Sequence, residues 1–442
     1  MVPPGEIFGF IPIWIGVFVF AGVCFGISGY VLYMRVFRLI QLGKSENRLD
    51  QPLKRLANTL VVALGQRKVL QRVSLRDRAG IGHVFIFWGF LSFVTSYILF
   101  IFLDSIDRDI SKAIFTEGGV KIFVFIIDSL GLAILSALVW ALFRRWALKP
   151  NRLSFDLTRS ADAVIIVGAI ASLMIFTFLV EGFYAGMVNN GFTAEGPHAA
   201  SPVGTVLGKL FDGLGEDTLK TLHGLFWWGH LAIILGFGMY IPFSKHMHMV
   251  AAPINAFLHD LNPRGTLHPI PDIETAESYG ANRVQEFTWK ELLDGYACAV
   301  CGRCTDSCPA NLTGKALSPM HIVESIKDHL LAVGPRILKN RGKGNGGDEE
   351  TPVIGNVVSE EAIWDCVTCG ACEQECPVAI EHIDSIVDMR RNLVLEQSKI
   401  PETARNALQS METRGHPWAG TKFNRTDWAE GLDVKLISEN GH

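Results

Sequence analysis

The hydrophobic residues in the first half of this chain gather into five long stretches. Each is long enough to cross a hydrocarbon layer of ~30 Å at the helical rise of ~1.5 Å per residue. They predict membrane-spanning helices at about residues 9–34, 80–103, 119–143, 160–182 and 219–243. The first stretch lacks a basic start and a small-residue cleavage site, so it predicts a retained anchor rather than a signal peptide.

The pattern becomes polar after about residue 250. We predict a membrane domain over 1–250, a linker over 251–284, a helical domain over 285–400 and a C-terminal tail over 401–442 that leads to a partner or to a further cysteine-rich domain. Apolar residues at helical spacing predict helices from His321 to Leu331 and from Ile383 to about Gln397. The predicted fold class is therefore all-α, with a five-helix transmembrane bundle followed by a smaller helical domain.

Composition and charge agree with a chain of two parts. Hydrophobic residues make up 49% and charged residues 19%, too apolar for a soluble protein and too polar for a membrane bundle alone. The loop at 36–79 holds ten Lys and Arg against three acids, whereas the loops at 104–118 and 183–218 together hold three against eight. Because basic loops face the cytoplasm, we expect a multi-pass protein of the cell membrane with its N-terminus outside and everything after residue 243 inside. The net charge of -4 suggests no nucleic-acid partner.

Eight of the nine cysteines fall in two runs of identical spacing. The runs read Cys298-x2-Cys301-x2-Cys304-x3-Cys308-Pro309 and Cys366-x2-Cys369-x2-Cys372-x3-Cys376-Pro377. Three thiolates spaced in this way curl around three corners of one [4Fe-4S] cluster, and in two-cluster ferredoxins the fourth cysteine serves the other cluster. We therefore predict a first cysteine set (Cys298, Cys301, Cys304, Cys376) and a second cysteine set (Cys366, Cys369, Cys372, Cys308), each the ligands of one cluster.

Two other uses of these cysteines fit less well. Zinc needs four ligands, usually in two pairs, and each run holds more than that pattern requires. Disulfides need an oxidising compartment, which the predicted topology argues against. The ninth cysteine, Cys24, lies in an apolar stretch and is expected to be a small buried residue.

Histidines near one membrane edge suggest a haem b. A haem between two histidines needs both imidazoles at nearly the same depth, and His83, His246 and His248 share one level, whereas His230 lies roughly 20 Å away along the fifth span. We predict that His83 and His248 ligate an inner haem, with His246 as the fallback ligand. The alternative is that these are interfacial histidines hydrogen-bonded to backbone or lipid. A continuous helix would place His230 and His248 on one face, unless Pro242 bends it.

The outer half of the bundle offers a second candidate site. His230 has no histidine opposite, because the second span carries Phe93 and Val94 at that depth. His230 and His223 therefore belong either to a second haem or to a quinone pocket. Asp128 is a possible quinone or proton site, since carboxyls inside membranes usually serve function, and a hydrogen bond to Ser129 or to a neighbouring helix is the alternative.

These features resemble known membrane electron carriers. The spans with His83, His230 and His248 resemble the haem b gamma subunit of respiratory nitrate reductase, and the cysteine runs resemble the helical ferredoxin domain of heterodisulfide reductase and anaerobic glycerol-3-phosphate dehydrogenase. Their combination, with Gly82-His83-Val-Phe-Ile-Phe-Trp-Gly-Phe and Ser244-Lys-His-Met-His248, resembles membrane iron-sulfur oxidoreductases that link electron transfer flavoprotein to menaquinone. The nitrate reductase subunit has two histidines on its second span, so its outer haem does not carry over. Fused members also continue into further cysteine-rich domains.

The resemblance implies an iron-sulfur and haem b quinone oxidoreductase, or a subunit of one. Electrons would pass between a cytoplasmic flavoprotein, or a cysteine-rich iron-sulfur subunit, and menaquinone or another quinone in the bilayer. One alternative is the quinol-oxidising membrane arm of a heterodisulfide- or sulfite-reductase-like complex. A third hypothesis is a redox-sensing membrane anchor without enzyme activity.

Overall fold

A computed structural model describes residues 2–4, 11–74, 78–107, 109–150, 157–194, 196, 200–263, 265–270, 273–276, 278–340, 351–418 and 427–434. Within these ranges the chain is helical and forms no β-strand, with isolated bridges only at Lys44–Thr288 and Ile354–Val358. Its α-helices are α1 (Ile13–Leu32), α2 (Arg38–Ile40), α3 (Pro52–Thr59), α4 (Arg67–Leu70), α5 (Ala79–Ser96), α6 (Asp104–Ile106), α7 (Ile110–Phe143), α8 (Leu157–Asn189), α9 (Pro202–Leu210), α10 (Glu216–Tyr240), α11 (His248–Leu258), α12 (Trp289–Ala297), α13 (Arg303–Asp306), α14 (Pro309–Leu312), α15 (Pro319–Asn340), α16 (Glu360–Trp364), α17 (Ala371–Glu375), α18 (His382–Arg391) and α19 (Glu402–Arg414).

Five helical segments are long and apolar enough to cross a membrane, which confirms the all-helical prediction and the number of spans. They are Ile13–Ile40, Ala79–Ile106, Ile110–Leu148, Ala161–Asn189 and Glu216–Phe243. Each overlaps one predicted stretch and extends past at least one of its ends. Some of these extensions carry charged residues, such as Arg144 and Glu216, which a search for unbroken apolar stretches leaves out.

The bundle turns large apolar side chains outward. Val19, Ile122 and Val139 are each more than 60% exposed, as lipid-facing side chains would be. Small residues let the helices approach: a Cβ on Gly89 of α5 would lie 2.5 Å from Ile134 Cδ1 of α7. The bundle is therefore close-packed inside and apolar outside.

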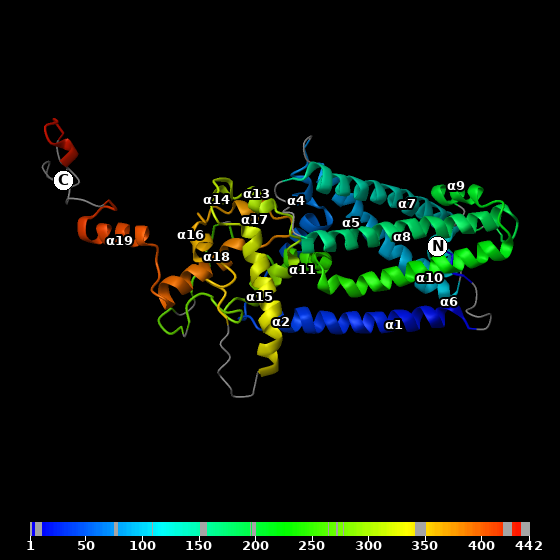
Figure 1. Cartoon of the computed structure of the whole chain (residues 1–442), viewed down its shortest axis with the longest axis horizontal. Helices are drawn as coiled ribbons and strands as arrows, with labels where there is room; N and C mark the ends of the chain where they lie inside the picture. The colour runs from blue at the N-terminus through cyan, green and yellow to red at the C-terminus, as the bar shows by residue number, and fades with distance from the viewer. Residues whose placement is uncertain are drawn as a thin grey trace.

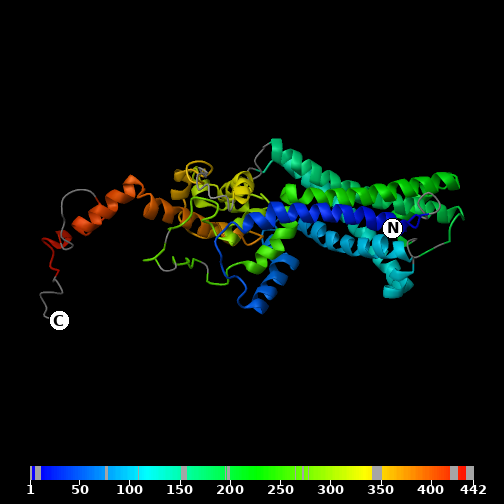
Figure 2. The same cartoon turned by 90° about the horizontal axis from the view of Figure 1, so that it is seen from below.

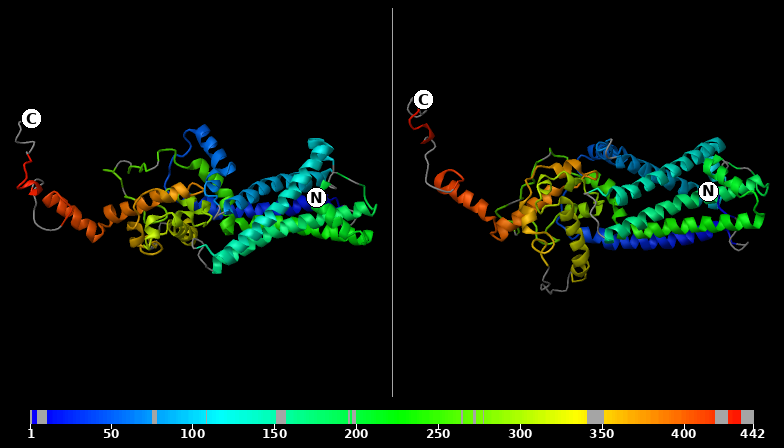
Figure 3. Two further views of the ribbon diagram at one scale, coloured as in Figure 1. Left: turned by 90° about the horizontal axis from the view of Figure 1, so that it is seen from above. Right: turned by 45° about the horizontal axis from the view of Figure 1, so that its top comes forward.

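The cysteine runs lie in a compact helical body at one end of the bundle, opposite the N-terminus, and α19 projects beyond it (Figure 1; Figure 3). Its core contains the fully buried Phe287, Leu330 and Ile386. Helix α12 starts with a capping box in which Thr288 and Glu291 each accept a backbone N–H of the other. The helix predicted from His321 to Leu331 lies within the longer α15. The helix predicted from Ile383 to about Gln397 corresponds to α18 followed by the π-helical turn Asn392–Glu396.

The fifth span does not continue into a single helix. After α10, Pro242 lies in a 3-10 turn and Ser244 is extended, with φ -111° and ψ 165°, before α11 begins at His248. The expectation that His230 and His248 share one helical face is therefore wrong. Residues 248–258, where the linker was expected to begin, are helical instead.

The basic loop at 36–79 is folded rather than extended. It contains α3 and α4, and α3 lies beside α11 (Figure 2). The Arg55 guanidinium donates to the carbonyl oxygens of Phe257, at 3.2 Å, and His259, at 2.7 Å. This loop thus joins the membrane helices to the cysteine-bearing body.

Candidate functional site

The second cysteine set lies around one cavity. Cys308, from the first run, lines it together with Cys366, Cys369 and Cys372, and its empty volume is about 320 Å³. Pro309 begins α14 immediately after Cys308, so the fourth cysteine turns away from its own run. The structure therefore brings together the four residues that crossed ligation predicts for this set.

The first cysteine set gathers on the other side of the same core. Cys298 and Cys376 pack together against Val323 and Ile380. Cys304 lies close enough to interact electrostatically with Cys298, Cys301 and Cys376. The two sets approach each other at Cys304 and Cys372, which share one apolar cluster. Each fourth cysteine is thus grouped with the opposite run.

Backbone amides point at the sulfur atoms. The Thr368 N–H donates to Cys366 Sγ at 3.3 Å, and the Ile380 N–H donates to Cys376 Sγ at 3.4 Å. Hydrogen bonds of this kind help to set the reduction potential of a bound cluster. The loops are therefore arranged to hold and tune a sulfur-ligated centre.

The buried thiols fit a cluster better than they fit free cysteines. Burial raises the pKa of Cys298 to about 12 and that of Cys376 to about 11, so both would stay protonated in neutral water. A bound metal deprotonates a coordinating thiol, which removes that cost. Within the described ranges, no three His, Cys, Asp or Glu converge on a point suited to a single metal ion. A four-iron cube is wider than one ion, so its cysteine ligands need not converge on a single point.

Three histidines meet where the bundle joins the cysteine body. The His246 and His248 ring centroids are 5.4 Å apart, and both rings interact electrostatically with His83 or with each other. We call His83, His246 and His248 the histidine cluster. Burial lowers the pKa of His246 to about 3 and also lowers that of His248, so both rings are neutral, as haem ligands must be.

His230 lies elsewhere, at the level of Tyr97. Its ring is fully buried and meets Tyr97 edge-to-face at 5.5 Å. Neither ring nitrogen has a hydrogen-bond partner among the described residues; the Leu173 carbonyl is near but outside hydrogen-bond geometry. His223 contacts Tyr184 at 6.5 Å. Sequence reasoning compared His230 with Phe93 and did not identify Tyr97, one helical turn further on.

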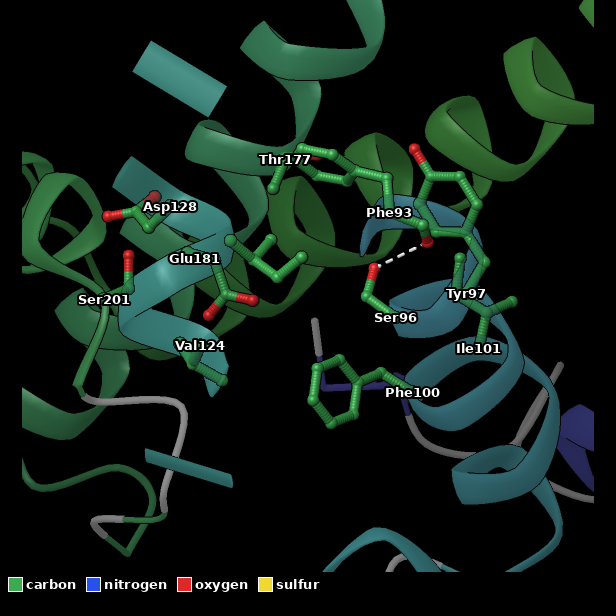
Figure 4. A pocket seen from close by; sticks show the side chains of 11 residues that line it. Phe93, Ser96, Tyr97, Phe100, Ile101, Val124, Asp128, Thr177, Glu181 and Ser201 are labelled. Carbon is green, nitrogen blue, oxygen red and sulfur yellow. Dashed lines mark hydrogen bonds between the residues drawn. The ribbon is translucent and has the colours of Figure 1, made fainter. Parts of the chain in front are cut away.

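A second cavity lies in the bundle at this level. We call it the carboxylate cavity. Asp128, Glu181 and Ser201 gather on one side of it, and Phe93 and Tyr97 lie on the other (Figure 4). Its lining is Phe93, Ser96, Tyr97, Phe100, Ile101, Val124, Ile127, Asp128, Thr177, Glu181 and Ser201.

The two carboxylate oxygens of Asp128 differ in their contacts at this cavity. Its Oδ2 accepts the Val203 N–H at 2.6 Å, at the start of α9, while Ser129 donates to the Phe125 carbonyl instead. Its Oδ1 is buried and has no hydrogen-bond partner in the part of the chain that the structure describes. The alternative predicted for Asp128, a hydrogen bond to a neighbouring helix, is therefore present at Oδ2.

A buried charge network joins the two halves, and sequence reasoning missed it. Glu381, five residues after Cys376, accepts from Arg48 at 2.8 Å and lies 3.5 Å from Lys290 Nζ. Lys290 also pairs with Asp294 at 2.9 Å, and Asn255 donates to Asp294 at 2.8 Å. Only the excess of basic residues at 36–79 hinted at such partners.

Comparison with known proteins identifies the cysteine body. Residues 290–377 match the 4Fe-4S dicluster domain, which supports two [4Fe-4S] clusters. No solved structure matches the chain.

Several curated relatives are similar over much of the sequence. The "Probable iron-sulfur-binding oxidoreductase FadF" of Bacillus subtilis is 33% identical over 93% of this chain and 61% of its own length. The "EtfAB:quinone oxidoreductase" of Syntrophomonas wolfei is 33% identical over 90% of this chain and 58% of its own length. A subunit of the ferredoxin:CoB-CoM heterodisulfide reductase of Methanosarcina mazei is 31% identical over 26% of this chain and 55% of its own length.

The chain spans about three-fifths of the length of the first two relatives. A "Probable membrane-anchored ferredoxin" of Chromohalobacter salexigens is 34% identical over 38% of this chain and 27% of its own length. The chain therefore joins a 4Fe-4S dicluster domain to five apolar helices and is similar over most of its length to iron-sulfur oxidoreductases.

Proposed function

We propose that this chain carries single electrons between a protein partner in the cytoplasm and a quinone in the membrane. The observation that supports this most is the series of sites along the molecule: two cysteine sets, then the histidine cluster, then the carboxylate cavity. When bound, two [4Fe-4S] clusters and haem b would supply one-electron redox steps, while the protein sets their positions and surroundings. In this proposal residues 285–400 form the cytoplasmic ferredoxin-like domain.

His83 and His248 are the residues we assign to haem b. They come from different helices, α5 and α11, and would hold the haem between these helices. The His248 Nδ1–H donates to the Lys245 carbonyl at 2.8 Å, which leaves Nε2 for a metal. His246 packs against Phe237 at 5.1 Å and remains the fallback ligand.

The carboxylate cavity is the quinone site that we propose. Aromatic and aliphatic walls suit a flat ring, and Asp128 Oδ1 can exchange a proton with a quinone oxygen. Fourteen residues separate His83 from Tyr97, which corresponds to about 21 Å of helical rise. That is a long distance for one electron step, so we also propose that the ring of His230 would hold a second haem, which would supply an intermediate one-electron centre.

An electron transfer flavoprotein is the partner that we propose, because the relative named EtfAB:quinone oxidoreductase aligns with 90% of this chain. The similarity to the heterodisulfide reductase of Methanosarcina mazei covers 26%. The longer similarity includes the membrane helices, so it supports a quinone-linked function over a role as a disulfide-reductase arm.

A reduced-minus-oxidised visible spectrum of the purified protein tests the proposal. We expect a haem b band, two haems per chain and the iron of two clusters. His83→Ala should lose one haem and keep both cluster EPR signals, whereas His321→Ala, on the exposed face of α15, should lose nothing. Full haem content in His83→Ala would refute the ligand assignment, and one haem per chain in the wild type would remove the centre at His230.

A further inference from the structure

The two cysteine runs fold as two copies of one loop. Val300 and Thr368 both have φ of 52°, and Gly302 and Gly370 follow with φ of 72° and 73°. A short helix starts directly after each glycine, α13 in the first run and α17 in the second. Because the backbones correspond position by position, any side chain that differs between the copies distinguishes the two cluster sites.

The position after the glycine differs most clearly. It is Arg303 in the first run and Ala371 in the second. The Arg303 side chain is buried, and its guanidinium donates to the Lys68 carbonyl at 3.1 Å and the Val69 carbonyl at 3.4 Å. Both carbonyls belong to α4, which lies between α13 and the membrane bundle (Figure 1). The first loop is therefore tied to the membrane half by a residue that the second loop lacks.

Arg303 also brings positive charge to the histidine cluster. It lies close enough to His83 to interact with it electrostatically. His83 is the fifth residue of α5, and α4 packs against α5. The guanidinium therefore lies between the first cysteine set and a proposed haem ligand.

A second attachment reaches the same cysteine set. Asn255 of α11, the helix that starts at His248, donates to the carbonyl oxygens of Val378, at 3.0 Å, and Ala379, at 3.1 Å. These carbonyls lie two and three residues after Cys376. Two helices that carry or adjoin the histidine cluster thus hold the two loops that supply the first cysteine set.

Further contacts from α4 and the segment after it hold the ends of both short helices. Lys68 Nζ donates to the Glu373 carbonyl at 3.1 Å, and Arg72 bonds Glu375 and Ser307. These contacts attach the whole cysteine-bearing body to the bundle. Because they reach both short helices, they do not distinguish the first cysteine set from the second.

The second cysteine set opens in the other direction. Of the eight cysteines in the two runs, Cys369 alone is exposed. The apolar side chain of Val367, which lines the same cavity as Cys369, is also exposed, at 64%. Cys308 and Cys366 line the adjoining cavity. The contacts of this run with α4 and the segment after it are made at Glu373 and Glu375, which follow Cys372 and lie at least four residues beyond Cys369 in the sequence.

We propose that the second cysteine set is the port for the water-soluble partner, that the first cysteine set faces the haem, and that Arg303 is the positioning residue of that junction. The proposal rests on the proposed function and adds the order of the sites. Arg303 fixes the first loop on α4 and places a positive charge beside His83, which favours the reduced state of a nearby centre. Ala371 does neither for the second loop.

The accessibility of the two centres to water can be measured on the intact reduced protein. An aqueous dysprosium chelate speeds the spin relaxation of a paramagnetic centre near the surface, and the EPR signals are assigned with Cys369→Ser and Cys301→Ser. We expect several-fold faster relaxation for the signal that Cys369→Ser alters, and little change for the signal that Cys301→Ser alters. Equal relaxation, or the reverse order, would overturn the proposal.

Redox titration tests the role of Arg303. Arg303→Gln should lower the midpoint potential of the haem held by His83, and Arg303→Lys should restore most of it. Arg390→Gln is the matched control, because Arg390 donates to the Ile363 and Cys366 carbonyls of the second run; it should leave the haem potential unchanged. An unchanged haem potential in Arg303→Gln would refute the positioning role. A protein without haem would refute the proposed function, yet the relaxation order would still test the port.

Discussion

His248 Nδ1 lies 2.8 Å from the Lys245 carbonyl oxygen, so the ring donates from Nδ1 and presents Nε2. The same turn directs His246 against Phe237. We therefore expect His248→Ala to lose the haem of the histidine cluster and His246→Ala to keep it, as measured by the pyridine haemochrome assay. Loss in His246→Ala with retention in His248→Ala would make the fallback residue the ligand.

Crossed ligation predicts which cluster each fourth cysteine serves. Cys376→Ser should alter the EPR signal of the cluster bound by Cys298, Cys301 and Cys304, because Cys376 packs against Cys298. Cys308→Ser should alter the other signal. Cys24→Ser, which changes a buried cysteine of α1, should leave both signals intact. Damage to the same-run cluster in either variant would contradict the crossing.

Asp128→Asn should slow quinone reduction by roughly 10²-fold, a typical loss when a proton-transfer group is removed. The amide oxygen still accepts the Val203 N–H, so α9 should stay anchored and haem content should not change. The measurement is the rate of reoxidation of reduced haem by a soluble menaquinone analogue. Ser129→Ala is the control, since its hydroxyl bonds only the Phe125 carbonyl. Equal rates in both variants would leave Asp128 as a helix anchor alone.

Glu381 gives a stability prediction. Glu381→Gln removes one buried counter-charge from both Arg48 and Lys290, while Arg48 keeps Glu46 and Lys290 keeps Asp294. It should therefore cost more than ~1 kcal/mol but less than the ~3 kcal/mol of a buried charge left without any partner. Glu360→Gln removes the exposed pair with Lys399 and should cost less than ~1 kcal/mol. The temperature at which the visible cluster absorbance is lost compares them. Similar losses in both variants would show that the buried network does not stabilise the domain.

Glu291 predicts a pH dependence. Burial, followed by the charge of Asp388, raises the pKa of Glu291 to about 8. The folded state therefore keeps a proton that the unfolded state releases, so its stabilising contribution is complete below pH ~4.5 and declines as pH rises through ~8. Glu291→Gln should flatten this decline in the temperature of cluster loss. The exposed Glu361→Gln should not; an identical pH profile in both variants would contradict the prediction.

Sequence patterns predicted the features that depend on residue type and spacing. Five apolar stretches gave the number of spans, because lipid demands unbroken hydrophobic helices. The duplicated cysteine spacing predicted the dicluster domain, because a cube fixes the spacing of its ligands. The ligand sets themselves stay predictions, although Cys308 lies with the opposite run as expected.

Features that depend on long-range packing were missed. The prediction that His230 and His248 share one helical face was wrong because the extended Ser244 interrupts the helix. A single proline in the sequence suggests a bend but does not show how large it is. In the sequence, nothing distinguishes Arg303 from another residue between two cysteine ligands. Its role depends on the hydrogen bond to a carbonyl of α4, which only the structure shows. Tyr97 was missed because residues of the second span were compared with His230 by membrane depth alone. Depth does not show which side chain of that helix points into the bundle.

The break at Ser244 also has an assembly consequence. Because α11 packs on α12, His248 is joined to the dicluster domain, whereas His83 belongs to the bundle. A haem held by both histidines would link the bundle to the dicluster domain. It could therefore bind to both residues only after the two parts have docked. Haem insertion would then be the last step of maturation, and a chain that lacks it would present the seam at α4 to proteases.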